Sequence, residues 1–169
     1  MSSLHIADTG LFVAMGQPSN SRYQAVRRFV RRNDITFVVP QRVYDELTTD
    51  QSAVENPPVD TAIEAGWVQV AAPLPFSKPI VSRVMDGVQR YIASVDDRPA
   101  DNVEQADAAL AALAAQQLST GETTAVYIYT TDIAAGDGAE TVLADEGYGD
   151  SVTFVNGFRF IDHLLTGDT

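Results

Sequence analysis

The sequence predicts an α/β layered fold with a mainly parallel central sheet. Short apolar segments alternate along the chain with longer segments whose apolar residues recur at helical spacing. The apolar segments are hydrophobic at nearly every position, which is typical of parallel strands covered by helices on both faces. A chain of 169 residues is long enough to bury its own core, and we expect residues 1–169 to form a single domain.

The first elements follow from local composition. Residues 4–7 form an apolar strand, and a helical segment begins at residues 11–15. Ser19-Asn20-Ser21 offers N-caps for a helix over residues 22–32, in which apolar residues recur at helical spacing. The apolar run at 35–40 ends in proline, which suits a buried strand better than a helix.

The middle of the chain continues the alternation. Residues 41–50 are helical in pattern, and a short helix follows from residue 57 until Gly66 ends it. A third strand is expected at 67–71. After a proline-rich stretch, a helix is expected over roughly residues 79–94, followed by a polar turn at 95–102.

In the last third, Asp101 and Glu104 resemble a capping box that opens an alanine-rich helix over residues 103–118. The segment 123–130 has the strongest strand composition, being rich in β-branched and aromatic residues. A loop and helix over 134–148 come next. A final strand at 152–156 and a closing helix at 158–165 complete the pattern.

Composition excludes several kinds of functional site and indicates the setting in which the protein works. Cysteine is absent, which excludes disulfides, thiolate zinc sites and cysteine nucleophiles. The net charge is −12, and Lys78 is the only lysine beside ten arginines. This acidic, lysine-poor composition favours adaptation to molar salt, in which carboxylates repel one another and polyanions only weakly. No signal peptide and no apolar run of about 20 residues is present, so we expect a cytoplasmic protein without a membrane span.

The tripeptide Asp8-Thr9-Gly10 has two chemical interpretations. An aspartic protease needs two such loops on β-rich lobes, and this chain has one, followed by helical spacing. Alternatively, Asp8 ends the first strand and Asp132 ends the strand at 123–130, which would place both acids at the carboxyl edge of a parallel sheet, where ligands bind. Either aspartate alone could equally serve as a helix cap.

The third acid lies on the alanine-rich helix. Asp107 shares one face of this helix with Val103, Leu110 and Leu113, so that it interrupts an apolar stripe. A carboxylate in such a place is costly unless it is paired, hydrogen-bonded or bound to a metal.

The fourth acid lies on the helix at 41–50. Glu46 falls beside the apolar Val43 and Leu47, whereas Asp45 points away, although a one-residue change in helix phase would exchange them. Together, Asp8, Glu46, Asp107 and Asp132 could surround hard cations. Carboxylate oxygens suit Mg²⁺ or Mn²⁺, and such ions can activate water for phosphodiester hydrolysis.

These motifs, in this order, resemble those of the PIN-domain nucleases: Asp8-Thr9 at a strand end, Glu46 on a helix, Asp107 on an alanine-rich helix, and Thr130 and Asp132 after the fourth strand. The resemblance spans nearly the whole chain. It implies a three-layer α/β/α sandwich and a metal-dependent ribonuclease. It further implies that the four acids hold Mg²⁺ or Mn²⁺, that Thr130 helps to position Asp8, and that Thr9 is a further supporting hydrogen-bonder.

The chain also departs from that pattern. Some members carry another acid where this chain has Ala134, and Asp137 is the next candidate. The segment from roughly 73 to 100 is longer than in the compact toxins of the family, so a toxin with an antitoxin partner and a stand-alone protein both remain open. A homodimer is expected by resemblance only. The alternative function is a PIN-like binding or scaffold module without catalysis.

Other candidate residues have weaker support. A basic cluster on the second helical segment is either a phosphate-binding ridge, a docking site for an acidic antitoxin segment, or a solvated, ion-paired face; it comprises Arg27, Arg28, Arg31 and Arg32. His5 and His163 are expected to be ordinary surface or edge residues. A haloacid-dehalogenase-like phosphatase would need an acid at Gly10, and a receiver domain would need a lysine elsewhere than Lys78. The common nucleotide-binding glycine motifs are absent.

Overall fold

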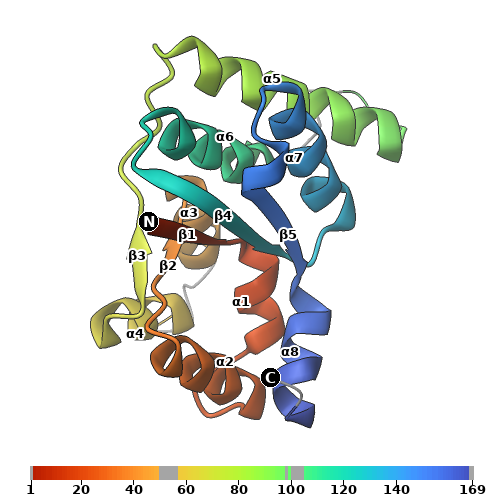
Figure 1. Ribbon diagram of the computed structural model, residues 1–169. Helices are drawn as coiled ribbons and strands as arrows, with labels where there is room; N and C mark the ends of the chain where they lie inside the picture. The colour runs from red at the N-terminus through yellow and green to blue at the C-terminus, as the bar shows by residue number, and fades with distance from the viewer. Residues whose placement is uncertain (1, 50–56, 98, 100–104, 168–169) are drawn as a thin grey trace.

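Five parallel strands form one sheet in the order β3-β2-β1-β4-β5 in this computed structural model, which describes residues 2–49, 57–97, 99 and 105–167 (Figure 1). The predicted α/β fold with a parallel sheet is confirmed. The strands are β1 (Ser2–Ala7), β2 (Phe37–Val39), β3 (Val68–Val70), β4 (Thr123–Thr130) and β5 (Val152–Asn156).

Helices cover both faces of the sheet, as a three-layer sandwich requires (Figure 1). On one face α5, α6 and α7 pack together, and on the other α1, α2 and α8 do so, while α3 contacts both α1 and α6. The helices are α1 (Thr9–Met15), α2 (Ser21–Arg32), α3 (Gln41–Thr49), α4 (Pro58–Ala65), α5 (Pro79–Asp96), α6 (Gln105–Ser119), α7 (Ile133–Asp145) and α8 (Gly157–Thr166). A short 3₁₀ turn, η2 (Gly149–Ser151), precedes β5.

Local sequence signals set most helix ends. Asn20 is the N-cap of α2, and its side chain accepts a hydrogen bond from the Arg22 backbone N–H. Gly66 ends α4 in the left-handed conformation, with φ of 90°, which glycine adopts without steric cost. At the end of α5, Asp97 takes that conformation, so the helix runs to Asp96, two residues into the segment predicted as a polar turn.

The prediction of a loop before α7 is wrong. This helix begins at Ile133, directly after Asp132, which caps it by accepting a hydrogen bond from the Ala135 N–H. Two glycines in this part of α7 are places of close packing. A Cβ atom at Gly136 would lie 2.5 Å from the Phe154 ring, and one at Gly138 would lie 2.9 Å from the Tyr91 ring.

The prediction that apolar residues cover one face of α6 understates how much of this helix is buried. Nearly every residue from Ala106 to Ala115 is buried, because α6 lies between the sheet and the helices α5 and α7. Alanine side chains are short enough to let backbone elements approach from several sides. The predicted capping box, Asp101 and Glu104, and the predicted stripe residue Val103 lie outside the described residues.

His5 differs from its prediction as an ordinary surface or edge residue. It lies on β1, the middle strand of the sheet, where its ring stacks on Tyr127 with centroids 4.9 Å apart. Its Nδ1 is 2.9 Å from the Tyr129 hydroxyl, and burial lowers the His5 pKa. His163, in contrast, is exposed in the last turn of α8.

Candidate metal and catalytic site

The carboxyl ends of β1 and β4 lie side by side at the centre of the sheet. The two strands pair along their length, with Ala7 opposite Tyr129, and the Asp8 N–H donates to the Tyr129 carbonyl at 3.0 Å. The strands β2 and β3 lie on one side of this pair and β5 on the other. The chain therefore leaves these two strands in opposite directions, and open parallel sheets generally bind ligands at such a point. We refer to this region at the two strand ends as the crevice.

Asp8 is the most enclosed acid of this crevice, with 4% of its surface exposed. Its Oδ2 accepts a hydrogen bond from Thr130 Oγ1 at 2.5 Å, and its Oδ1 accepts one from the Thr9 N–H at 2.6 Å. Burial raises the pKa of Asp8 most strongly, and the negative charges of Glu46 and Asp132 raise it further, against the lowering effect of the two hydrogen bonds. Glu46 and Asp132 are therefore each close enough to repel the carboxylate of Asp8.

Thr130 connects two of these acids. Its side chain is fully buried, and its hydroxyl donates to Asp8 while accepting a hydrogen bond from the Asp132 N–H at 3.0 Å. Asp132 Oδ1 in turn accepts from the Ala135 N–H at 3.1 Å. Asp132 thus caps α7 with one carboxylate oxygen, and its other oxygen makes no hydrogen bond to the part of the chain that the structure describes.

Glu46 joins the group through Thr9. The Thr9 hydroxyl donates to Glu46 Oε2 at 2.7 Å, which ties the start of α1 to α3. Asp45 faces a different neighbour, accepting a hydrogen bond from Gln41 Nε2 at 3.1 Å. The structure therefore brings Glu46, rather than Asp45, to the side of Asp8.

Asp107 lies in the first turn of α6 and is half-buried. Because α6 leads directly into β4, its first turn lies towards the carboxyl ends of the strands, and the helix packs against β1, β4 and α3. Asp137 is exposed on α7 and takes no part in the hydrogen bonds that connect Asp8, Glu46 and Asp132.

The glycine of the Asp-Thr-Gly tripeptide has a packing role. A Cβ atom on Gly10 would lie 2.0 Å from Thr131 Oγ1, and one on Gly157 would lie 3.0 Å from Thr131 Cγ2. Thr131 precedes Asp132, so the small residues allow the turn that carries this acid to sit against α1 and α8. No signal in the sequence pointed to Gly157.

A hard divalent cation fits the donor chemistry of this crevice, because every candidate ligand is a carboxylate. A cation would also offset the repulsion that raises the pKa of Asp8. Within the described residues, however, no three His, Cys, Asp or Glu side chains are already grouped closely enough to hold an ion. Ion binding by the described acids would therefore need their side chains to move closer together.

A family model described as Halobacterial PIN domain matches residues 1–169. The chain belongs to the PIN-domain family. The resemblance expected from the sequence is thereby confirmed. PIN domains are generally nucleases that use divalent metals, and this chain has a nuclease-type fold. A search of curated proteins finds no match. No helix in the described ranges is long and apolar enough to cross a membrane.

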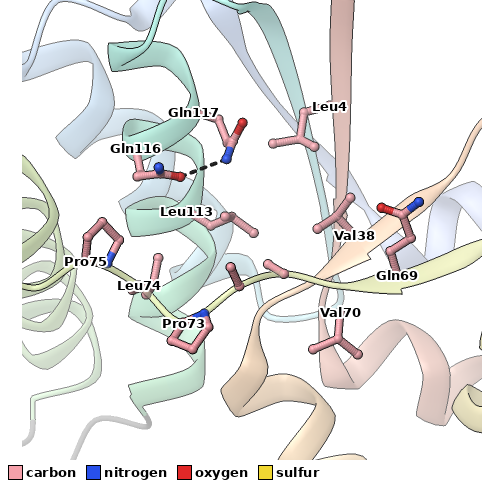
Figure 2. Close-up of a pocket in the computed structure, with 12 residues that line it drawn as sticks. Leu4, Val38, Gln69, Val70, Pro73, Leu74, Pro75, Leu113, Gln116 and Gln117 are labelled. Carbon is pink, nitrogen blue, oxygen red and sulfur yellow. Dashed lines mark hydrogen bonds between the residues drawn. The ribbon is translucent and has the colours of Figure 1, made fainter.

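Sequence reasoning missed two cavities of this PIN domain. They share a wall formed by residues 71–74 and by Leu113 of α6. One, of about 340 Å³, is lined by apolar side chains and three glutamines; Figure 2 shows Leu113 on α6 near Pro73 and Leu74 of the segment that follows β3. The other, of about 330 Å³, lies beside the start of α3. The proline-rich composition of residues 72–79 gave no indication of either cavity.

The arginines of α2 lie on the layer opposite to α5, α6 and α7. Arg28, Arg31 and Arg32 are exposed, and Arg27 is half-buried. The ion pair found in the described part of the chain joins Arg83 and Glu146 at 2.6 Å, so the α2 cluster is not ion-paired there.

Proposed function

We propose that this protein is a ribonuclease that hydrolyses RNA phosphodiester bonds with Mg²⁺ or Mn²⁺ held by Asp8, Glu46, Asp107 and Asp132. One observation carries the proposal: a buried carboxylate, Asp8, has two further carboxylates within electrostatic reach. Such an arrangement destabilises a fold unless a cation compensates for it. Destabilising charge clusters of this kind are typical of catalytic sites.

The hydroxyls of the site hold its acids in place. Thr130 orients Asp8 and favours its ionised form, which is the form that binds a cation. Thr9 holds Oε2 of Glu46 by a hydrogen bond. The cation, when bound, supplies a Lewis acid that activates water and stabilises the leaving oxygen.

The remaining expectations concern setting and partners. On this proposal, residues 1–169 form one domain that acts in the cytoplasm. The proposal extends to a toxin role with an antitoxin partner and to a homodimer. The net charge of −12 and the single lysine support the proposal that the protein is active in molar salt, where its repulsion of RNA is screened. The family match to halobacterial domains agrees with this setting.

The rival function is a binding or scaffold module with a PIN fold. It is favoured by one observation, that the acids of the described residues are not grouped tightly enough to hold an ion. A module of this kind would bind RNA or protein without cutting, and its fold would not respond to Mn²⁺.

A cleavage assay separates the two. Labelled single-stranded RNA, and DNA of the same sequence, are incubated in molar KCl with Mn²⁺ or Mg²⁺. Wild type should cut the RNA in a metal-dependent way, and Asp8→Asn should not. Asp150→Asn is the matched control, because Asp150 is an exposed acid in η2, which precedes the amino end of β5, whereas the acid cluster lies at the carboxyl ends of the strands. Equal cutting by wild type and Asp8→Asn, or no cutting by either, would refute the proposed site.

A further inference from the structure

The second cavity, which we call the Phe76 cavity, lies between α3, α6 and the segment that follows β3. It has a volume of about 330 Å³, and its lining includes Arg42, Asp45, Phe76 and Leu113. It is part of neither the acid cluster nor the closed core.

The Phe76 cavity adjoins the acid cluster along α3. Arg42 lines the cavity, and Glu46 follows four residues later on the same side of the helix. Because α3 begins directly after β2, at the carboxyl edge of the sheet, an RNA strand bound at Glu46 would have this cavity beside it.

The side chains of the cavity suit a nucleotide. Phe76 lines the cavity and is 53% exposed, so part of an aromatic ring is accessible to a base. Arg42 is exposed, and its guanidinium, which has no ion pair in the described part of the chain, matches the geometry of a phosphate. Gln41 and Asp45, which are exposed, add polar atoms to the lining, while the buried Leu113 makes part of it apolar.

The neighbouring cavity lacks these groups. It shares Leu113 and residues 71–74, but its lining contains no charged residue and no aromatic ring (Figure 2). Of the two cavities, only the Phe76 cavity therefore combines a stacking surface with a phosphate-binding cation. Stacking also retains its strength in molar salt, where purely electrostatic binding is weakened.

We propose that the Phe76 cavity binds one nucleotide of single-stranded RNA next to the bond that is cut, with its base stacked on Phe76 and its phosphate at Arg42. This inference rests on the proposed ribonuclease function. It assigns a substrate-binding site to a cavity outside the acid cluster.

The first test compares Phe76→Leu with Phe76→Tyr. The leucine variant loses the ring, and its KM for a short single-stranded RNA should rise about 5- to 10-fold with kcat unchanged. The tyrosine variant keeps the ring and should behave like wild type. Gln69→Ala, which alters only the neighbouring cavity, is the control. A KM equal to that of wild type in Phe76→Leu would overturn the inference.

The second test uses RNAs in which a single base is removed at each position in turn. Wild type should bind the RNA that lacks the base beside the cut more weakly than the intact RNA. Phe76→Leu should bind both RNAs with the same affinity. Equal losses in both proteins would show that the base does not stack on Phe76.

A third measurement concerns Arg42. The slope of log KM against log salt should fall by about 0.7 in Arg42→Gln, as expected for one lost phosphate contact on a single strand. Arg90→Gln removes an exposed arginine on α5 and should leave the slope unchanged. An unchanged slope in Arg42→Gln would remove Arg42 from the proposed contact.

Fluorescence anisotropy keeps the two proposals distinguishable. RNA binding is measured in Asp8→Asn protein, which is not expected to cut. If wild type cuts no RNA but Phe76→Leu still weakens binding in the Asp8→Asn background, the ribonuclease proposal fails and the cavity binds RNA. If wild type cuts and the Phe76 variants bind equally, the cavity proposal fails alone.

Discussion

Replacing Thr130 by valine removes one hydroxyl from the centre of the site and leaves the shape of the side chain nearly unchanged. This hydroxyl donates to Asp8 Oδ2 at 2.5 Å and accepts from the Asp132 N–H at 3.0 Å, and the side chain is fully buried. A buried hydrogen bond to a charged group contributes ~1.5–3 kcal/mol, and leaving a backbone donor unpaired adds to the loss. We therefore expect Thr130→Val to lower the free energy of unfolding by about 2–3 kcal/mol.

The same substitution should change the pH dependence of cleavage. The Thr130 hydrogen bond lowers the pKa of Asp8 by stabilising its ionised form, so its removal raises that pKa. Activity that requires ionised Asp8 is then lost at a higher pH as the solution is acidified. The acid limb of the pH–rate profile with Mn²⁺ should shift to higher pH.

Two assays, a pH–rate profile and a thermal unfolding curve, test this reasoning. Tm should fall by about 4–12 °C, as ~2–3 kcal/mol implies for a chain of this size. Thr124→Val is the control, because it removes an exposed hydroxyl of the same strand that donates to the Ser2 carbonyl at 3.2 Å. A lowered Tm with an unchanged acid limb would show that Thr130 only stabilises the fold, which would refute its role in positioning a functional Asp8.

Three further results are expected. Without metal, Asp8→Asn should have a higher Tm than wild type at neutral pH. The raised pKa of Asp8 makes wild type lose stability as pH rises through that pKa, so the difference should shrink in acid; a lower Tm for the variant at neutral pH would contradict this. The Tm of wild type should rise with KCl from dilute to molar solution, since salt screens a net charge of −12, and a constant Tm would argue against salt adaptation. Gly10→Ala should slow cleavage strongly and lower Tm only slightly, because its Cβ would displace Thr131 and with it Asp132. A lowered Tm with full cleavage activity would contradict this.

The sequence predicts the strands of this fold well because their signals are local. The strands β1 and β4 are predicted by their apolar composition and by the polar residue that follows each of them. The order of motifs was enough to indicate the family. The position of Asp8 and Asp132 at the carboxyl edge of one sheet was expected from the behaviour of parallel sheets in general. The direct pairing of β1 with β4, which makes these acids neighbours, was not predicted.

Features that depend on close packing could not be predicted in this way. Gly136 and Gly138 have the composition of a loop, and only the positions of the Phe154 and Tyr91 rings show why they belong to a helix. His5 lies on the middle strand because β2 and β4 pair on either side of β1, which is a long-range fact. The hydrogen bond from Thr9 to Glu46 likewise joins residues far apart in the chain.

Binding of Mn²⁺, measured from the free-ion signal in electron paramagnetic resonance, tests most directly whether the acids of this crevice form a metal site. Wild type, Asp8→Asn and the exposed control Asp150→Asn are titrated in molar KCl at neutral pH. We expect wild type and the control to bind Mn²⁺ with the same affinity, and Asp8→Asn to lose that binding. Equal Mn²⁺ binding by wild type and Asp8→Asn, or none by wild type, would contradict a metal site at Asp8.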